Sequence, residues 1–353
     1  MKQYPQSVQA TYEMMKTKLR DVVPDFELQI KAEIAYEINR LKAEKDAIIL
    51  GHNYMEPALF HSIPDFVGDS LELSRKAAQT DKQIIVFCGV EFMAETAKLL
   101  NPNKTVLLPA AKAGCSLASS ITADDVRALK ARFPGVPVVT YVNTYADVKA
   151  ETDICCTSGN AVKVVESLDS DTIIFLPDEF LAQNVARETG KRILFPKVYK
   201  NGSTHIELDE APTHGFIGWH GRCEVHEQFT VQDIQNVRLQ FPDVEIVAHP
   251  ECSPDVVAAS DFSGSTTAMI RHVEQSKKSR YLLLTECSMA DNIVAANPHK
   301  ELLRLCSVRC PHMGQITLED TLAALRNNQY EIHVPEAVRI PAARAVQRMI
   351  EIG

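Results

Sequence analysis

The chain has 353 residues, of which 45% are hydrophobic and 24% are charged, and its formal net charge is −9. These values are ordinary for a globular protein with room for two or three domains, but the acidic balance argues against nucleic-acid binding, which needs a basic face. The longest apolar runs are about five residues, far short of the ~20 that span a bilayer, so the sequence predicts no membrane association.

The predicted elements alternate between helices and strands along the chain. Residues 7–45 are typical of two amphipathic helices rich in Lys and Glu. Helices are also predicted over 123–133 and 231–241, each ending at a Phe-Pro pair, and over 317–327 and 335–352. Apolar runs typical of buried strands lie between the helices. Strands separated by helices of about 10–15 residues favour parallel sheets covered on both faces, which is the α/β class.

A faint threefold repeat organises these elements. Three stretches, which begin at Ile84, Ile173 and Leu282, each consist of an apolar run, a short turn and the start of an amphipathic helix. An alanine in each stretch is followed by a cysteine, after 21, 41 and 20 residues respectively. These pairs are Ala94 with Cys115, Ala182 with Cys223, and Ala290 with Cys310. The longer middle spacing predicts one extra loop of about 20 residues, between positions 201 and 215.

Each unit of the repeat also contains an earlier apolar run that ends in a polar corner, followed by a small hydroxyl cluster at the start of a helix. The corners are His52 with Tyr54, Tyr141 with Asn143, and His249 with Glu251, and the clusters contain Ser70, Ser158, and Ser265 with Thr266. Parallel strands place ligands at their carboxyl ends, where His and Tyr can transfer protons and Glu can act as a base. Hydroxyls at helix starts bind carboxylates and phosphates, although helix capping and ordinary strand-end hydrogen bonding are the simpler alternatives.

The sequence therefore predicts three similar α/β/α units with short parallel sheets around a pseudo-threefold axis, with the active site at their common centre. We place the first unit, with its N-terminal helices, at residues 1–118 and the second at 119–226. The third, with the C-terminal helices, spans 227–353. No low-complexity linker separates them, so we expect one compact body.

The nine cysteines do not indicate a disulfide framework. The start of the chain, residues 1–5, lacks the apolar core of a signal peptide, so we expect a cytoplasmic protein. That compartment is reducing, and an odd number of cysteines fits poorly with paired bridges. Cys88, Cys155 and Cys156 lie in or beside apolar runs, where cysteine behaves as a small core residue.

The three repeated cysteines differ, because Cys115, Cys223 and Cys310 each lie in a polar, turn-like setting. Three matched thiolates favour a metal site. Zinc usually takes four protein ligands with cysteine pairs at short spacing, and Cys306 with Cys310 offers one such pair, so zinc remains an alternative. Separations of 108 and 87 residues favour a cluster held between units. A [4Fe–4S] cluster with only three thiolates would keep one iron open as a Lewis acid.

These residues together resemble the A-type quinolinate synthase family of bacterial and archaeal NAD biosynthesis. The similarity runs in order from about residue 45 to 315. The stretches that carry it are Gly51-His52-Asn53-Tyr54, Gly68-Asp69-Ser70-Leu71-Glu72, Gly89-Val90-Glu91-Phe92-Met93-Ala94-Glu95-Thr96, Ala113-Gly114-Cys115-Ser116, Tyr141-Val142-Asn143-Thr144, Cys223-Glu224-Val225-His226, His249-Pro250-Glu251, Gly264-Ser265-Thr266 and Cys310-Pro311-His312-Met313.

The resemblance implies a transferase that condenses iminosuccinate with dihydroxyacetone phosphate to quinolinate, with release of phosphate and water. It implies a [4Fe–4S] cluster held by Cys115, Cys223 and Cys310, and a functional link to L-aspartate oxidase. The implied substrate-binding residues are His52, Ser70, Tyr141, Val142, Asn143, Ser158, His249, Pro250, Glu251 and Thr266. Among these and their neighbours, the implied catalytic residues are His52, Tyr54, His249 and Glu251.

One family feature is not carried over. Some relatives have C-x₂-C-x₂-C around the last ligand, whereas only Cys306 precedes Cys310 here, so no redox switch is inferred there. Two other functions use the same residues. One is a zinc-dependent hydrolase or lyase, and the other is a non-catalytic metabolite or redox sensor. Iron and sulfide content distinguishes the zinc enzyme from the cluster enzyme. Catalytic turnover distinguishes the cluster enzyme from a sensor, which would bind its ligand without converting it.

Overall fold

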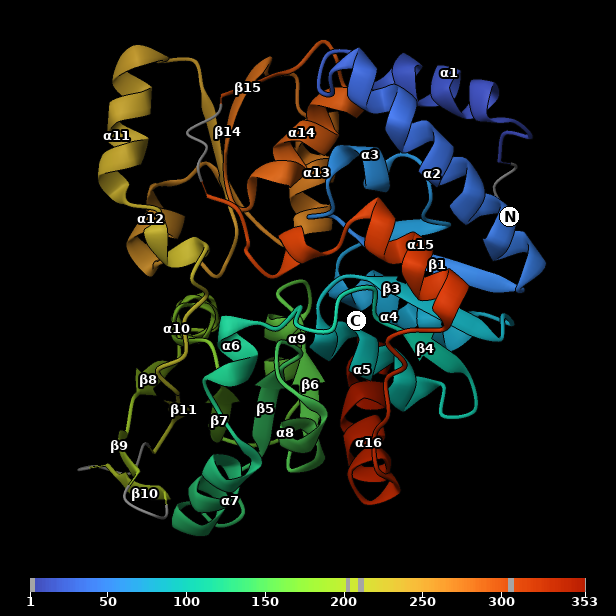
Figure 1. Cartoon of the computed structure of the whole chain (residues 1–353). Helices are drawn as coiled ribbons and strands as arrows, with labels where there is room; N and C mark the ends of the chain where they lie inside the picture. The colour runs from blue at the N-terminus through green and yellow to red at the C-terminus, as the bar shows by residue number, and fades with distance from the viewer. Residues whose placement is uncertain (1–3, 201–203, 209–212, 304–307, 353) are drawn as a thin grey trace.

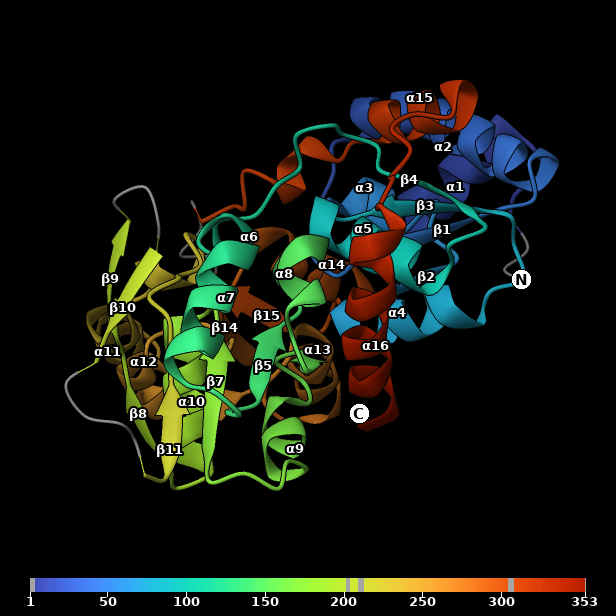
Figure 2. The same cartoon turned by 90° about the horizontal axis from the view of Figure 1, so that it is seen from below.

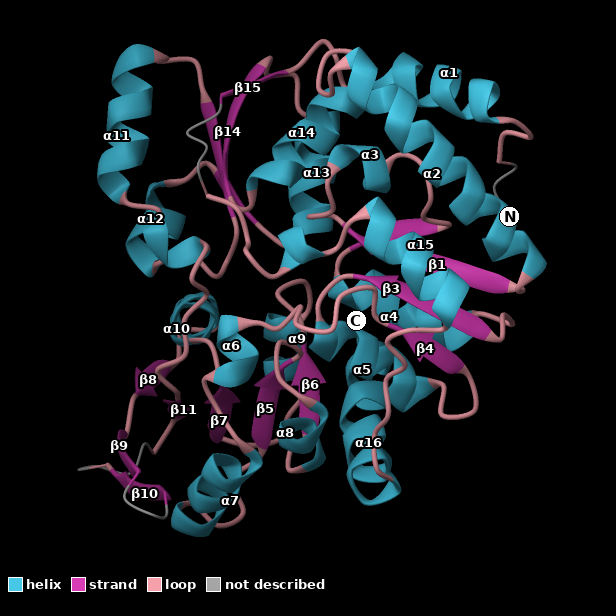
Figure 3. Ribbon diagram, in the orientation of Figure 1, coloured by secondary structure: helices cyan, strands magenta, loops and turns pink. Residues whose placement is uncertain are grey.

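The computed structural model describes residues 4–200, 204–208, 213–303 and 308–352. In that part of the chain the strands form three parallel sheets and one two-stranded antiparallel sheet, and helices cover the parallel sheets (Figures 1 and 3). The predicted α/β/α units are therefore confirmed. In Figure 1 the first unit is blue to cyan, the second is green to yellow-green, and the third, with the C-terminal helices, is yellow to red. The unit boundaries at 118/119 and 226/227 stay a prediction.

The first sheet has the strand order β2-β1-β3-β4, and all its pairs are parallel. Its strands are β1 (Ala47–His52), β2 (Phe66–Gly68), β3 (Ile84–Cys88) and β4 (Thr105–Leu107). The helices of this part of the chain are α1 (Val8–Leu19), α2 (Asp25–Glu44), α3 (Pro57–Phe60), α4 (Ser70–Gln79), α5 (Glu91–Leu100) and α6 (Ser116–Ser119). The two predicted N-terminal helices are thus confirmed as α1 and α2.

The second sheet has the order β6-β5-β7-β11-β8 and is also parallel. Its strands are β5 (Val138–Tyr141), β6 (Ile154–Cys156), β7 (Thr172–Leu176), β8 (Arg192–Leu194) and β11 (Gly215–Ile217). Its helices are α7 (Ala123–Arg132), α8 (Ala146–Ala150), α9 (Ala161–Glu166) and α10 (Glu179–Glu188). The extra loop predicted between positions 201 and 215 overlaps an antiparallel strand pair, β9 (Lys197–Lys200) with β10 (Thr204–Glu207), of which β9 precedes the predicted range and β10 lies within it. Residues 201–203 and 209–212 lie outside the described part.

The third sheet has the order β13-β12-β14-β15, again parallel. Its strands are β12 (Glu245–Ala248), β13 (Phe262–Ser263), β14 (Arg280–Leu284) and β15 (Glu301–Leu303). The helices that follow the second unit are the short 3₁₀ helices η1 (His226–Gln228) and η2 (Met313–Gln315) and the α-helices α11 (Val231–Gln240), α12 (Pro254–Ala259), α13 (Thr266–Gln275), α14 (Cys287–Ala296), α15 (Leu318–Asn327) and α16 (Glu336–Ile352). The helices predicted near 123, 231, 317 and 335 are all present.

A repeated hydrogen bond shows that the three units are built alike. In each one an aspartate that precedes the second strand of the sheet accepts a backbone N–H from the first strand. The donors and acceptors are Ile49 N to Asp65 Oδ2 (2.9 Å), Val138 N to Asp153 Oδ2 (2.8 Å) and Ile246 N to Asp261 Oδ2 (2.7 Å). Each bond fixes the chain where it re-enters the sheet, so the corner at the opposite end of the first strand is placed in the same way in every unit.

The C-terminal helices cover the first two units. Helix α15 packs on α2 and β3, and α16 packs on α5, α8 and β6. Figure 2 shows α16 between the first unit and α8. The largest hydrophobic cluster accordingly joins side chains of both units and of α16, including Phe87, Phe175 and Met349, all at most 2% exposed. Burying each such side chain contributes roughly 1.5–3 kcal/mol to stability.

The cysteines predicted to be core residues are confirmed as such, because Cys88, Cys155 and Cys156 have no exposed surface. Cys306 lies outside the described residues. Among the described residues, no helix is both long and apolar enough to span a bilayer.

Candidate active site

One pocket lies where the three units meet, at the carboxyl ends of β1, β5 and β12. The predicted residues that line it are His52, Tyr54, Ser70, Tyr141, Asn143, Ser158, His249, Glu251 and Thr266, together with Cys115, Cys223 and Cys310. The pocket thus collects the polar corner and the hydroxyl cluster of every unit. Val142 and Pro250, which were also predicted to bind substrate, are not among the described residues that line it.

Each of the three cysteines begins a short helical turn. The backbone carbonyls of Cys115, Cys223 and Cys310 accept the N–H of the residue four positions later, each at 3.0 Å. The sulfur therefore lies at the N-terminal end of the turn, and Met313 N lies 3.5 Å from the Cys310 Sγ. Amide groups directed at a sulfur favour the thiolate, which is the form that binds metals.

Burial opposes this effect. It raises the pKa of Cys115 to about 12 and that of Cys310 to about 11, although backbone N–H groups of the following turn lower both values. It also raises the pKa of Cys223 well above the usual value, and the charge of Glu251 adds to the rise. The thiols therefore need a cation to replace their protons, because a buried thiolate without a positive partner is costly.

The donor set fits an iron–sulfur cluster, because three matched sulfurs, each with amide groups from its own turn, line one pocket. A single metal ion has a second candidate donor set. Ligand atoms of Cys223, His226 and Glu251 all lie within 4.8 Å of one another. The pocket can thus hold a metal centre on the side that carries the cysteines.

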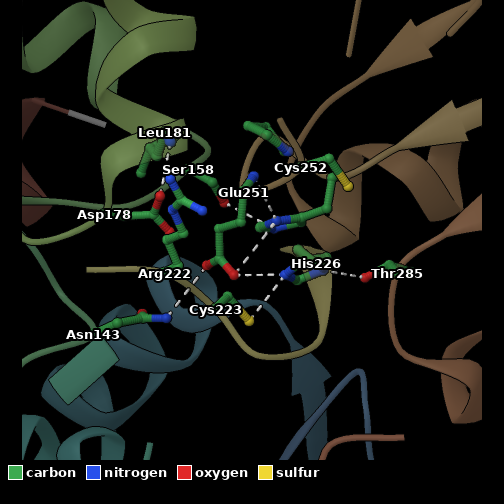
Figure 4. Close-up of polar contacts among 12 residues, drawn as sticks. Asn143, Ser158, Asp178, Leu181, Arg222, Cys223, His226, Glu251, Cys252 and Thr285 are labelled. Carbon is green, nitrogen blue, oxygen red and sulfur yellow. Dashed lines mark hydrogen bonds and ion pairs between the residues drawn. The ribbon is translucent and has the colours of Figure 1, made fainter. Parts of the chain in front are cut away.

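Glu251 is the centre of the hydrogen-bond network in the pocket (Figure 4). Its Oε1 accepts from the Tyr141 hydroxyl at 2.5 Å, and its Oε2 accepts from His226 Nδ1 at 2.7 Å. Asn143 Nδ2 lies 3.4 Å from Oε1. Burial alone would raise the pKa of Glu251, but the electrostatic interactions with His226 and His249 and the hydrogen bonds from His226 and Tyr141 hold it well below its usual range. Glu251 is therefore an ionised carboxylate that can accept a proton.

A chain of hydroxyls extends this network to the first unit. His226 Nε2 lies 2.9 Å from Thr285 Oγ1, whose hydroxyl is 2.5 Å from that of Tyr54. Tyr54 thus connects to Glu251 through Thr285 and His226. Burial, followed by the charge of Glu251, raises the pKa of Tyr54 and of Tyr141 well above the usual value, so both phenols carry their protons. This arrangement can relay a proton between the two sides of the pocket.

His52 and His249 are held in the same way in their units. His52 Nδ1 accepts the N–H of Tyr54 at 3.2 Å, and His249 Nδ1 accepts the N–H of Glu251 at 3.3 Å. Burial lowers the pKa of His52 to about 4 and that of His249 to about 3, so both rings are neutral near pH 7. A neutral ring that accepts at Nδ1 carries its proton on Nε2. His249 Nε2 lies 3.4 Å from Ser158 Oγ, so this ring donates to the hydroxyl cluster.

The hydroxyl clusters open helices that point at the pocket. Ser70 and Thr266 are the first residues of α4 and α13, whose N-caps are Asp69 and Ser265. Free amides and hydroxyls at helix starts can hold carboxylates and phosphates. No lysine or arginine is among the described residues that line the pocket, so neutral donors and helix ends supply its attraction for anions.

Sequence reasoning assigned no role to three members of the site, Thr285, Asp178 and His226. Thr285 directly follows β14 and resembles an ordinary strand residue, and Asp178 is the N-cap of α10, so no sequence pattern distinguished either of them. Asp178 is fully buried next to Glu251 in Figure 4, and burial with the charge of Glu251 raises its pKa well above the usual value. The signal for His226 was its place three residues after Cys223, on the turn that the cysteine begins.

Comparison with known proteins identifies the family of this chain. The model of the quinolinate synthetase A protein family matches residues 36–351. This chain belongs to the quinolinate synthetase A family. It is similar to the quinolinate synthase of Sinorhizobium fredii, with 52% identity over 335 residues, covering 95% of this chain and 87% of the relative. Quinolinate synthase 2 of Mesorhizobium japonicum is 48% identical over 346 residues, covering 98% of this chain and 99% of that relative.

The quinolinate synthase of Caulobacter vibrioides is also similar, with 51% identity over 339 residues that cover 95% of this chain. Membership of the quinolinate synthetase A family makes this chain an enzyme that acts on small molecules in NAD biosynthesis. The resemblance stated from the motifs is thereby confirmed.

Gly221→Ala is predicted to disturb the loop that carries Cys223. An added Cβ would lie 2.6 Å from the Pro177 carbonyl oxygen, which cannot retreat because it already accepts the Gly221 N–H at 3.0 Å. We expect a loss of roughly 1–3 kcal/mol in the free energy of unfolding and a lower metal content per chain. Gly314→Ala is the control, since its Cβ would have open space in the turn after Cys310. Equal metal content in both variants would contradict the prediction.

The two buried histidines predict an acid-sensitive fold. Their pKa values of about 4 and about 3 lie below the ~6.5 of an unfolded chain. Below pH ~6.5 the two imidazoles bind protons in the unfolded state but not in the folded state. The free energy of unfolding therefore falls as pH drops towards 4, by up to about 1.4 kcal/mol per pH unit for each ring. Urea denaturation of the metal-free protein measures this effect. Between pH 7 and pH 5 the free energy of unfolding should fall less for His52→Gln than for the wild type.

Exposed His333 provides the control for this measurement, since His333→Gln should lose as much stability between the two pH values as the wild type. An unchanged loss in His52→Gln would show that the buried ring does not resist protonation.

Proposed function

We propose that this protein is a quinolinate synthase that condenses iminosuccinate with dihydroxyacetone phosphate to quinolinate, with release of phosphate and water. The observation that carries the proposal is one pocket, in a member of the quinolinate synthetase A family, that unites three cysteines with an ionised Glu251 and proton-bearing Tyr54 and Tyr141. Joining two carbon skeletons makes the enzyme a transferase. Iminosuccinate is a product of aspartate oxidation, which supports a functional link to L-aspartate oxidase in the cytoplasm.

The cofactor in this proposal is a [4Fe–4S] cluster on Cys115, Cys223 and Cys310. When bound, it supplies an open iron that acts as a Lewis acid towards a substrate oxygen. The support is chemical, because the three thiols need a cation to become thiolates, and three ligands leave a four-iron cluster one open position.

The remaining chemistry belongs to the side chains. Glu251 is the base for the protons that leave carbon and nitrogen during condensation, because it is ionised and buried. Tyr141 donates to Glu251 and can return a proton to a departing hydroxyl. His226 holds Glu251 through Nδ1 and connects it to Tyr54 through Thr285.

Binding in this proposal relies on neutral donors. His52 and His249 present Nε2–H groups to substrate oxygens, and Ser70, Ser158 and Thr266 offer hydroxyls for carboxylate and phosphate. Asn143 contributes its amide beside Glu251. Val142 and Pro250 contribute through the backbone of the corners on which they lie.

An anaerobic assay tests the activity directly. The iron- and sulfide-loaded protein, supplied with iminosuccinate and dihydroxyacetone phosphate, should form quinolinate, measured by chromatography. Glu251→Gln should lower kcat by about 10²–10⁴-fold because it removes the base. Glu245→Gln changes a glutamate at the start of β12, the strand that leads to the Glu251 corner, and should leave kcat unchanged. Binding without turnover in the wild type would instead favour a metabolite sensor.

Metal analysis tests the cofactor. Wild-type protein purified without oxygen should be brown and contain about four irons and matching sulfide per chain. Cys115→Ala, Cys223→Ala and Cys310→Ala should each lose the iron, whereas Cys156→Ala, a buried core cysteine, should keep it. Colourless protein with one zinc would instead support a mononuclear centre such as Cys223 with His226 and Glu251.

A further inference from the structure

The helix that follows the central strand of each unit packs against the next unit. Helix α5 of the first unit contacts α8 of the second, α10 of the second contacts α12 of the third, and α14 of the third contacts α3 of the first. Helices α3, α8 and α12 are the short helices that come directly after the polar corners (Figure 1). Each catalytic corner therefore lies against a helix of a different unit.

Asn184 on α10 makes the contact to the third corner. Its Nδ2 donates to the carbonyl oxygens of Pro250 at 2.8 Å and Cys252 at 3.0 Å. These carbonyls flank Glu251 on either side. Because carbonyls only accept, both bonds fix the orientation of the amide. Asn184 is 1% exposed, so water cannot replace the bonds if the side chain is removed.

Asn292 on α14 makes the same contact to the first corner. Its Nδ2 donates to the carbonyl oxygens of Asn53 at 3.2 Å and Met55 at 2.9 Å, which flank Tyr54. It is 2% exposed. Asn184 and Asn292 each lie two residues after the alanine of the repeat. The two contacts are thus equivalent positions of equivalent units.

The first unit makes the third contact with a different residue. Glu95 on α5 accepts the backbone N–H of Ala146 at 2.9 Å, at the start of the helix that follows the corner with Tyr141 and Asn143. Thr96, which occupies the asparagine position, donates instead to its own helix at Phe92. A side chain of the first unit therefore bonds to the corner region of the second unit, one of the second bonds to that of the third, and one of the third bonds to that of the first.

We propose that Asn184, Asn292 and Glu95 are positioning residues, each of which fixes the catalytic corner of the neighbouring unit. The proposal rests on the proposed function. Asn184 acts through Glu251, whose carboxylate must meet Tyr141 and His226 from other parts of the chain at 2.5 and 2.7 Å. Asn292 acts through Tyr54. A shift of about 1 Å in such a group can lower the rate about 10²-fold.

A double-mutant cycle tests the link to Glu251. Asn184→Ala should lower kcat by about 10–100-fold in the wild-type background. In the Glu251→Gln background the same change should have almost no effect, because the group it positions is already gone. Single-turnover quinolinate formation, measured by mass spectrometry, makes the slow variants comparable. If Asn184→Ala lowered the rate by the same factor in both backgrounds, the proposal would be overturned.

Asn101→Ala is the matched control. Asn101 is also a buried asparagine whose Nδ2 donates to two backbone carbonyls, those of Ala77 at 2.9 Å and Ala97 at 3.0 Å, but both lie within the first unit. It should lower the melting temperature about as much as Asn184→Ala while kcat stays unchanged. A loss of kcat that follows the loss of stability in both variants would indicate a merely structural role.

A second cycle keeps the proposal testable if Asn184→Ala fails to fold. Asn292→Ala should lower kcat in the wild-type background but not in the Tyr54→Phe background. An equal decrease in both backgrounds would contradict the proposal. Absence of quinolinate formation by the loaded wild type would refute the proposed function itself, which distinguishes the two failures. Iron content measured in every variant excludes cluster loss as the cause of a lower rate.

Discussion

The buried carboxylate of Glu251 is the constraint on which the site depends. An ionised carboxylate with 3% exposure is tolerated only if donors surround it. Tyr141 comes from the second sheet, and His226 comes from the turn after Cys223, so the charge is stable only when the second and third units are correctly placed. The same contact places His226 beside the Cys223 sulfur, at 3.2 Å. One interaction thereby fixes both the proposed proton acceptor, Glu251, and the proposed metal ligand, Cys223.

The pocket also has an unusual balance of charge for a site that would hold several anionic groups. Its described lining contains histidines, hydroxyls and amides but no lysine or arginine. Neutral donors placed before binding cost little reorganisation, and they discriminate by geometry more than by total charge. Asp178 fits this balance, because its raised pKa leaves Glu251 as the single ionised member of the two neighbouring carboxyls.

Much of this arrangement was predictable from sequence, because strand, corner, hydroxyl cluster and cysteine recur in order. His52, Tyr141 and His249 were recognisable at strand ends, and the three cysteines by their matched spacing. Thr285 was not, since a threonine that closes an apolar strand looks like any β residue until a histidine from another unit meets it. The packing of α16 on the first two units was also not predictable, because the apolar face of an amphipathic helix does not indicate which surface it packs on.

The circular order of the contacts between units has a further consequence. The first unit contacts the second, the second contacts the third, and the third contacts the first. A closed cyclic trimer has the same head-to-tail arrangement of interfaces, but here the three units belong to one chain. In a trimer of identical subunits all three corners would have to be identical. Covalent fusion removes that requirement. One corner can therefore carry an imidazole and a phenol, the next a phenol and an amide, and the third an imidazole and a carboxylate. Asymmetric chemistry at a symmetric centre is what the single chain makes available.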